Sequence, residues 1–121
     1  MVALVVAAAV VWTGCAHKPV AQPREIVFAC ADGNFYATGL HWQRWTATTA
    51  VATGTGHQND CTPNCSAGHF HTFPLTVRLS RVVVCIPGRH EFSHVAWDGV
   101  RLNGVPRAGS EIPCSFLKLK P

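Results

Sequence analysis

The sequence predicts an all-β domain, a small antiparallel β-sandwich or β-barrel of about six or seven strands that is stapled by disulfides. Three observations favour this fold class. Segments are short and either alternate between apolar and polar residues or are continuously apolar, as β-strands are. Ten glycines and eight prolines interrupt the 121 residues and bring turn signals at close intervals. No segment sustains the apolar period of a helix.

The first expected strand covers residues 25–30 and ends before the turn signal Asp-Gly-Asn. The second covers residues 35–47. Within it, the spacing of Leu40, Trp42 and Trp45 changes from two residues to three, which predicts a bulge. Further strands are expected at residues 46–55, 75–80, 81–86, 91–97 and 115–120.

The same alternation predicts which residues face the core. Leu75, Val77 and Leu79 are expected to point inward, because polar residues separate them. Gly54 and Gly56 are expected to loosen the strand at residues 46–55, since glycine adds no side chain to a sheet.

Residues 1–14 are expected to be an export signal. The apolar run Val2–Trp12 is too short for a membrane-spanning helix of about 20 residues but fits the roughly 7–15 residues of a secretory signal. It ends in Trp-Thr-Gly-Cys, which resembles the lipobox of bacterial lipoproteins, so we expect lipidation of Cys15. The alternative is an ordinary signal peptide whose tail contains a cysteine. Residues 15–24 then form a polar tether, and residues 25–121 form a single β domain.

The composition is that of a globular domain, with 48% hydrophobic and 13% charged residues. The net charge is +4, but the basic residues are scattered singly along the chain. Nucleic-acid-binding surfaces cluster Lys and Arg, so we expect no nucleic-acid partner. A mildly basic surface is compatible with attraction to anionic lipid or cell-wall polymers.

Six cysteines in an exported chain predict disulfides. Cys61 and Cys65 enclose a tight turn and are expected to pair, although closing so small a ring stabilises the fold by only about 2 kcal/mol. If Cys15 is acylated, one cysteine is left over and is expected to be a buried thiol. If Cys15 is not acylated, the six cysteines can form three disulfides.

The second disulfide has two possible pairings. Cys30 with Cys114 would join the first strand of the domain to the last, and Cys85 with Cys114 is the rival. Spacing alone does not decide between them.

The stretch HQNDCTPNCSAGHFH contains three histidines beside the cysteine pair, namely His57, His69 and His71. Imidazoles at such spacing can bind zinc or copper. A loop stapled by a disulfide is the favoured interpretation, because oxidised cysteines are not metal ligands. We therefore expect no metal and no cofactor, and the three histidines are the candidates if a metal does bind.

The sequence contains no catalytic signature. Its serines do not lie in a Gly-x-Ser-x-Gly context, and no glycine-rich phosphate loop follows a strand. The leftover cysteine beside His90 or His94 is the one pair that could supply a nucleophile and a base. No enzymatic activity is expected.

Aromatic residues offer a possible binding surface. Most aromatic side chains of a small β domain pack in its core, and Trp42 is expected there. Three-residue spacing places Trp45 on the opposite face of a regular strand, so Trp45 and Tyr36 are the candidates for an exposed ligand platform.

Several short motifs resemble those of a group of small secreted or lipid-anchored proteins of actinobacteria. The resemblance covers most of residues 26–81 and is carried by Cys30-Ala-Asp-Gly-Asn34, Leu40-His-Trp42, Asn59-Asp-Cys-Thr-Pro-Asn-Cys65, Gly68-His-Phe70 and Val77-Arg-Leu-Ser80. It implies a location outside the cytoplasm and supplies no catalytic residue.

These observations predict a non-enzymatic, exported cell-envelope lipoprotein whose β domain acts as a binding or structural module. It would be held at the outer face of the cytoplasmic membrane by its lipid, with free secretion as the alternative. The expected partners are the membrane, through the anchor, and a cell-wall polymer or another envelope protein. A secreted protein that binds zinc or copper and a small extracellular hydrolase are the alternative functions.

Overall fold

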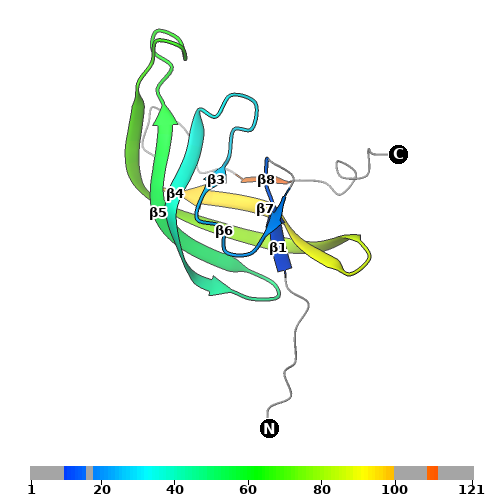
Figure 1. Cartoon of the computed structure of the whole chain (residues 1–121). Helices are drawn as coiled ribbons and strands as arrows, with labels where there is room; N and C mark the ends of the chain where they lie inside the picture. The colour runs from blue at the N-terminus through cyan, green and yellow to red at the C-terminus, as the bar shows by residue number, and fades with distance from the viewer. Residues whose placement is uncertain (1–9, 16–17, 100–108, 112–121) are drawn as a thin grey trace, which may run out of the picture.

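The computed structural model describes residues 10–15, 18–99 and 109–111. Over these residues the chain is all-β, as predicted, and no helix among them is long and apolar enough to cross a membrane. The strands are β1 Val10–Thr13, β2 Pro19–Val20, β3 Ile26–Val27, β4 Phe35–Trp45, β5 Ala50–Asn59, β6 Phe70–Ile86, β7 Arg89–Asp98 and β8 Gly109–Glu111 (Figure 1).

One sheet contains all of these strands, and it curls into a half-barrel (Figure 1). Seven strands follow the order β2-β1-β7-β6-β5-β4-β3, and β8 pairs with β7 off this path. The strands β4 to β7 are joined as successive antiparallel hairpins. At the other edge of β7, β1 runs parallel and β8 antiparallel, at different points along the strand. The two short strands β2 and β3 therefore form the edges of the sheet.

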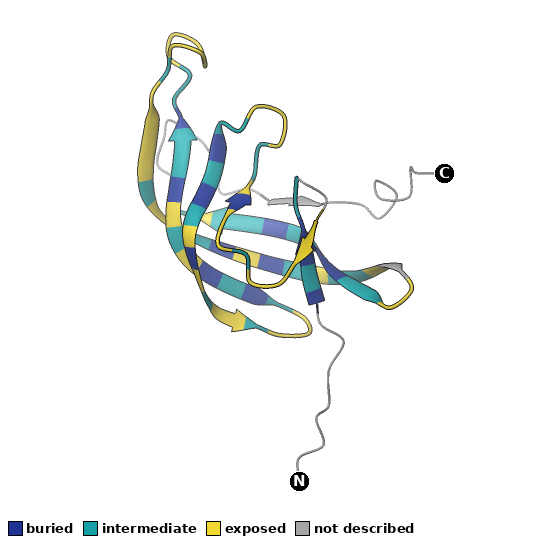
Figure 2. Ribbon diagram, in the orientation of Figure 1, coloured by how far each residue is buried: buried dark blue, intermediate teal, exposed yellow. Residues whose placement is uncertain are grey.

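The core lies on the inner face of the curl, where the sequence alternation placed it. Leu75, Val77 and Leu79 are buried on β6, and the alanines at 50 and 52 lie opposite them on β5 (Figure 2). The hairpin between β5 and β6 extends beyond the rest of the sheet, and its tip is exposed (Figure 2).

The bulge predicted in the second strand is confirmed. The pairing of β4 with β5 shifts register between Thr38 and His41 and again between Trp42 and Arg44. Gly39 lies within the first shift at φ 61°, a left-handed conformation that glycine adopts without steric cost. The shifts bring side chains that a regular strand would separate onto the same face.

The strands expected at residues 75–80 and 81–86 are a single strand, β6. The chain bends between them at Arg81, which has a φ of 59°, and continues in the same sheet. The Ser93 hydroxyl on β7 donates a hydrogen bond to the Arg81 carbonyl at 2.6 Å and holds the bend. The strand expected at residues 115–120 lies outside the described residues.

The described part of the chain contains two disulfides. Cys61 pairs with Cys65, as predicted. Cys30 pairs with Cys15, so the predicted partner Cys114 is wrong for Cys30. Cys15 follows β1 and Cys30 follows β3, and the curl brings these two regions of the sheet together. The rival pair Cys85–Cys114 lies outside the described side chains.

The strand directly before Cys15, β1 Val10–Thr13, is part of the folded sheet. Val10, Trp12 and Thr13 are each less than 5% exposed, and the Trp45 indole N–H on β4 donates to the Val10 carbonyl at 2.9 Å. The region expected to be a tether contains β2, which pairs with β1. Cleavage of the expected export signal after residue 14 would therefore separate β1 from the rest of the folded chain, and this cleavage stays a prediction.

Candidate functional site

The outer face of the sheet contains a group of aromatic side chains. Tyr36 points outward because its neighbours Phe35 and Ala37 are buried in the core. His57 is its partner in the register of β4 with β5, so both side chains lie on the same face. The two rings stack with centroids 4.5 Å apart and an interplanar angle of 8°.

A third ring and an aliphatic residue extend this group. Phe70, at the start of β6, is 48% exposed, and its centroid lies 5.8 Å from that of Tyr36. Val27 pairs with Tyr36 from β3, the neighbour of β4 on the side away from β5, and is 39% exposed. We call Val27, Tyr36, His57 and Phe70 the outer aromatic face.

The ring of His57 is held in place by a hydrogen bond. Its Nε2 lies 2.8 Å from the Thr38 hydroxyl, which projects from the same face of β4. Stacking on one side and this bond at its edge fix the orientation of the imidazole. The outer aromatic face is therefore pre-organised, which lowers the entropic cost of binding a ligand.

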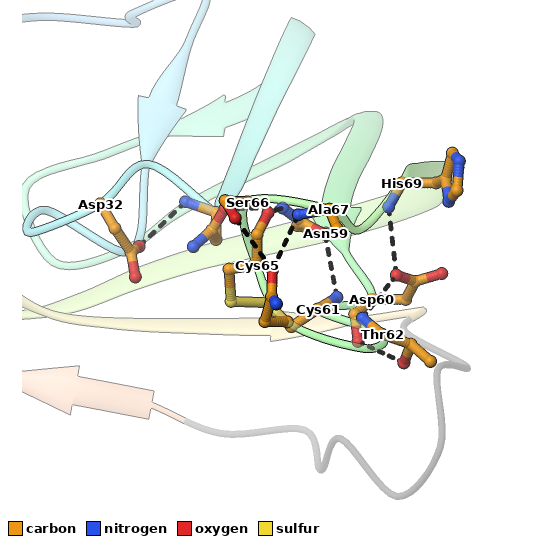
Figure 3. The surroundings of a disulfide bond; sticks show 11 residues. Asp32, Asn59, Asp60, Cys61, Thr62, Cys65, Ser66, Ala67 and His69 are labelled. Atoms are coloured by element: carbon orange, nitrogen blue, oxygen red, sulfur yellow. Dashed lines mark hydrogen bonds between the residues drawn. A yellow bond between two sulfur atoms is a disulfide. The ribbon is translucent and has the colours of Figure 1, made fainter.

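The stapled loop, residues 60–69, lies next to this face and is organised by Asn59. Asn59 is buried, and its side-chain Nδ2 donates to the Cys65 carbonyl at 2.8 Å and to Asn34 Oδ1 at 3.0 Å (Figure 3). Its Oδ1 accepts from the Cys61 amide at 2.9 Å. A Cβ on Gly68 would collide with this side chain, so the loop requires a glycine there.

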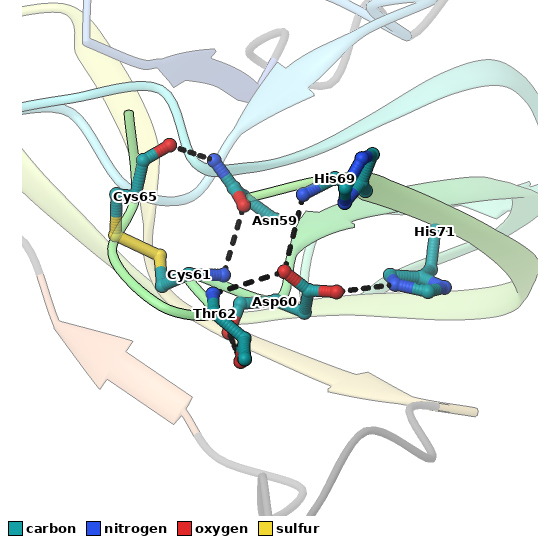
Figure 4. A network of polar contacts seen from close by, with 7 residues as sticks. All are labelled: Asn59, Asp60, Cys61, Thr62, Cys65, His69 and His71. Atoms are coloured by element: carbon teal, nitrogen blue, oxygen red, sulfur yellow. Dashed lines mark hydrogen bonds and ion pairs between the residues drawn. A yellow bond between two sulfur atoms is a disulfide. The ribbon is translucent and has the colours of Figure 1, made fainter. Parts of the chain in front are cut away.

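Asp60 forms a second polar centre in the loop. Its Oδ1 accepts from the amides of Thr62 and His69, both at 3.1 Å, and its Oδ2 accepts from His71 Nε2 at 2.8 Å (Figure 4). The bond from His71, followed by the two amide bonds, lowers the pKa of Asp60 from 3.8 to about 2. The carboxylate is therefore ionised at neutral pH and fixes the path of the loop.

The three candidate metal ligands do not converge. His57 is engaged by Thr38 and Tyr36, and His71 by Asp60. Figure 4 shows that His69 contributes its backbone amide to the network. Both cysteines of the loop are in the disulfide, and the described part of the chain contains no group of three or more His, Cys, Asp or Glu residues that could hold a metal ion. The described geometry gives the metal interpretation no support.

Trp45 was expected on the face opposite Trp42, and this placement is wrong, since Trp45 is partly buried and packs against the core. Tyr36 does lie on the outer face. The register shifts in β4 bring Trp42 and Trp45 to the same side, where their rings meet edge to face with centroids 4.8 Å apart. Trp45 also packs against Phe92 and reaches β1 through its hydrogen bond to Val10. Both tryptophans pack against the core.

The candidate catalytic pair, a leftover cysteine beside His90 or His94, lies partly outside the described residues. The thiol beside His90 or His94 would come from Cys85 or Cys114, and neither side chain lies within the described residues. The Ser66 hydroxyl donates to Asn64 Oδ1 and that of Ser93 to a backbone carbonyl, so in neither does the hydroxyl donate to a base.

Sequence reasoning missed Phe70, Val27 and Asn59. Phe70 lies two residues before Thr72, the register partner of His57, and is therefore on the same face of β6 as Thr72. The sequence could have indicated this only if the start of the strand had been known. Asn59 carried the signal of an Asn directly before a turn.

Comparison of the chain with protein-family models, curated proteins and solved structures found no match. The chemistry of the site follows from its own residues. Three aromatic rings and a valine offer apolar surface, and the hydroxyls of Thr55 and Thr72 are exposed on the same face. An apolar surface with a few hydroxyl groups suits a ligand that has an apolar face and polar groups at its edge.

Proposed function

We propose that this protein is an exported, non-enzymatic domain of the cell envelope that binds a cell-wall polysaccharide through the outer aromatic face. The observation that carries the proposal is the stacked pair Tyr36–His57 beside the exposed ring of Phe70. A sugar ring has an apolar C–H face and a polar rim of hydroxyls. The first matches aromatic rings, and the second matches the threonine hydroxyls around them.

The shape of the face supports a polymer over a small enclosed ligand. The outer aromatic face spans β3 to β6, because Val27, Tyr36, His57 and Phe70 lie on four adjacent strands. Adjacent strands are about 4.8 Å apart, so this row extends over about 15 Å. An extended chain of sugar rings can follow such a row, whereas a single small molecule would cover only part of it.

Export is supported by the disulfides. Two of them lie within the residues that the structure describes, and disulfides persist in oxidising compartments and are rare in the cytosol. The Cys61–Cys65 pair and the three bonds of Asn59 keep the stapled loop in one conformation beside the outer aromatic face.

Lipid attachment at Cys15 stays a prediction and competes with this fold. The Cys15 sulfur is bonded to Cys30, and a sulfur in a disulfide does not carry an acyl-glyceryl group. We propose the disulfide-bonded, uncleaved form as the folded domain. Mass spectrometry of the protein from its native host distinguishes the two forms, because a mature chain that begins at an acylated Cys15 would exclude the Cys15–Cys30 disulfide and remove β1.

The test of the binding proposal uses the single tyrosine of the chain. Incorporation of 3-fluorotyrosine labels Tyr36 alone, so its ¹⁹F resonance reports on the outer aromatic face. We expect soluble cell-wall polysaccharide fragments to shift this resonance with saturation. Loss of stacking area in Phe70→Ala should weaken binding about 5- to 10-fold, a cost of about 1–1.5 kcal/mol.

Val84→Ala is the matched control. Val84 is 55% exposed and lies near the other end of β6, so its truncation should leave the affinity unchanged. An unshifted Tyr36 resonance with every glycan fraction, or equal affinities for Phe70→Ala and Val84→Ala, would refute the proposal.

A further inference from the structure

A hollow of about 560 Å³ lies where the curled sheet does not close on itself. Its lining includes Val20 of the edge strand β2 and Ile26 and Val27 of the edge strand β3. Cys15 also lines it, so the Cys15–Cys30 disulfide lies at its border. We call this the seam hollow. Its volume is within the roughly 300–1,000 Å³ of small-molecule sites.

The walls of the seam hollow are largely apolar. Trp12 and Ile26 belong to the core and are 4% and 2% exposed. Val20 and Val27 also line the hollow and are 40% and 39% exposed. The two exposed valines, on the two edge strands that border the hollow, leave apolar surface in water. An aliphatic chain placed in the hollow would cover part of it.

Cations line the same hollow. Lys18 and Arg24 contribute two positive charges and Glu25 one negative charge, so the lining has an excess of one positive charge. Within the described part of the chain, neither Lys18 nor Arg24 has a carboxylate partner. Arg24 is held against the sheet, because its carbonyl accepts a hydrogen bond from the Leu40 amide at 3.0 Å.

We propose that the seam hollow binds a single-chain anionic amphiphile of the fatty-acid type. The alkyl chain lies between Val20 and Val27 above Trp12, and the anionic head lies at Lys18 and Arg24. This pairing satisfies both features of the hollow, since a neutral apolar molecule would leave the cations unpaired and a small anion would leave the valines exposed. The inference uses none of the residues of the glycan proposal except Val27, which lies at the border of both surfaces.

The test uses the full, disulfide-bonded chain and sodium dodecanoate below its micellar concentration, with isothermal titration calorimetry as the readout. We expect saturable binding of one molecule per chain. Each methylene removed from the alkyl chain should weaken binding by up to about fourfold, which corresponds to about 0.8 kcal/mol per buried CH₂. Dodecyltrimethylammonium has the same chain and a cationic head and should bind at least tenfold more weakly.

Two variants locate the site. Charge reversal in Lys18→Glu with Arg24→Glu should weaken dodecanoate binding at least tenfold. Arg78→Glu, which changes an exposed arginine on β6, is the matched control and should leave it unchanged. Val20→Asp places a carboxylate in the hollow at a partly exposed position and should abolish binding while the circular dichroism spectrum stays that of the folded domain.

Three results would overturn the inference. They are no saturable binding, equal affinity for the anionic and cationic amphiphiles, and affinity unchanged in both the charge-reversed variant and Val20→Asp. Phe70→Ala separates the two surfaces, because Phe70 belongs to the outer aromatic face and is not among the described residues that line the hollow. This variant should leave dodecanoate binding unchanged.

Discussion

Asp60 accepts three hydrogen bonds, and together with Asn59 it determines the path of the stapled loop. The folded state holds its pKa at about 2, below the value of 3.8 that it has in an unfolded chain. A carboxyl group with a lowered pKa stabilises the folded state above the unfolded pKa, and this contribution is lost as the pH falls through the folded pKa. The contribution of Asp60 is therefore complete above pH 3.8 and disappears towards pH 2.

We predict that Asp60→Asn removes this pH dependence. The wild-type protein should be more stable than the variant above pH 4, and the difference should shrink as the pH is lowered to 2, as measured by thermal unfolding. The Thr62 and His69 amide resonances should titrate with the carboxylate in the wild type alone. Asp32→Asn is the control, since Asp32 is exposed on another turn. A difference that stays constant down to pH 2 contradicts this role for Asp60.

At the same scale, sequence reasoning identified Tyr36 as a surface residue and placed Trp45 there wrongly. The bulge itself was predicted. Which face Trp45 lies on, however, depends on two separate register shifts in β4, and the local sequence does not predict the position of the second shift. Phe70 and Val27 complete the outer aromatic face only because β3, β4, β5 and β6 are neighbours. Such neighbours are set by long-range pairing, which composition and spacing do not reveal.

At the scale of elements, the alternation of Leu75, Val77 and Leu79 gave the correct inner face. The expected break after residue 80 is a bend, because the left-handed Arg81 redirects the strand without ending its pairing with β7. Gly54 was expected to loosen β5, but the structure gives it a different reason. A Cβ there would lie 2.7 Å from the Thr38 carbonyl oxygen and 2.9 Å from Leu40 Cδ2.

We therefore predict that Gly54→Ala destabilises the domain by about 1–3 kcal/mol, since the added methyl group overpacks the junction of β4 and β5. Urea denaturation at equilibrium measures the change. Thr55→Ala, at the next and exposed position of the same strand, should change the stability by no more than about 0.5 kcal/mol. If Gly54 only loosened the strand, alanine would stabilise it, and that outcome would exclude the packing explanation.

For the whole molecule, closure of the half-barrel depends on contacts between its two edge regions. The Trp45 indole joins β4 to β1, the Phe28 ring after β3 lies with its centroid 4.8 Å from that of Trp97 on β7, and Cys15–Cys30 links the two ends covalently. The sequence assigned residues 10–13 to a removable signal, because an apolar run at a chain end has the composition of both a signal and a buried strand. The pairing of β1 with β7 shows that residues 10–13 form a strand in the uncleaved chain, while their removal as a signal stays a prediction.

The two disulfides should therefore differ in their effect on stability. Cys15–Cys30 closes a loop with a sequence separation of 15 and Cys61–Cys65 one of 4. Loop entropy gives about 3 kcal/mol for the first and about 2 kcal/mol for the second. The first disulfide also holds the edges of the sheet together, whereas the second lies in a projecting hairpin tip. The Cys15→Ser, Cys30→Ser variant should therefore lose more stability than the Cys61→Ser, Cys65→Ser variant, by more than the roughly 1 kcal/mol that loop entropy alone gives. Denaturation of both variants in urea measures the losses, and an equal or larger loss in the second variant would show that the half-barrel closes without its edge disulfide.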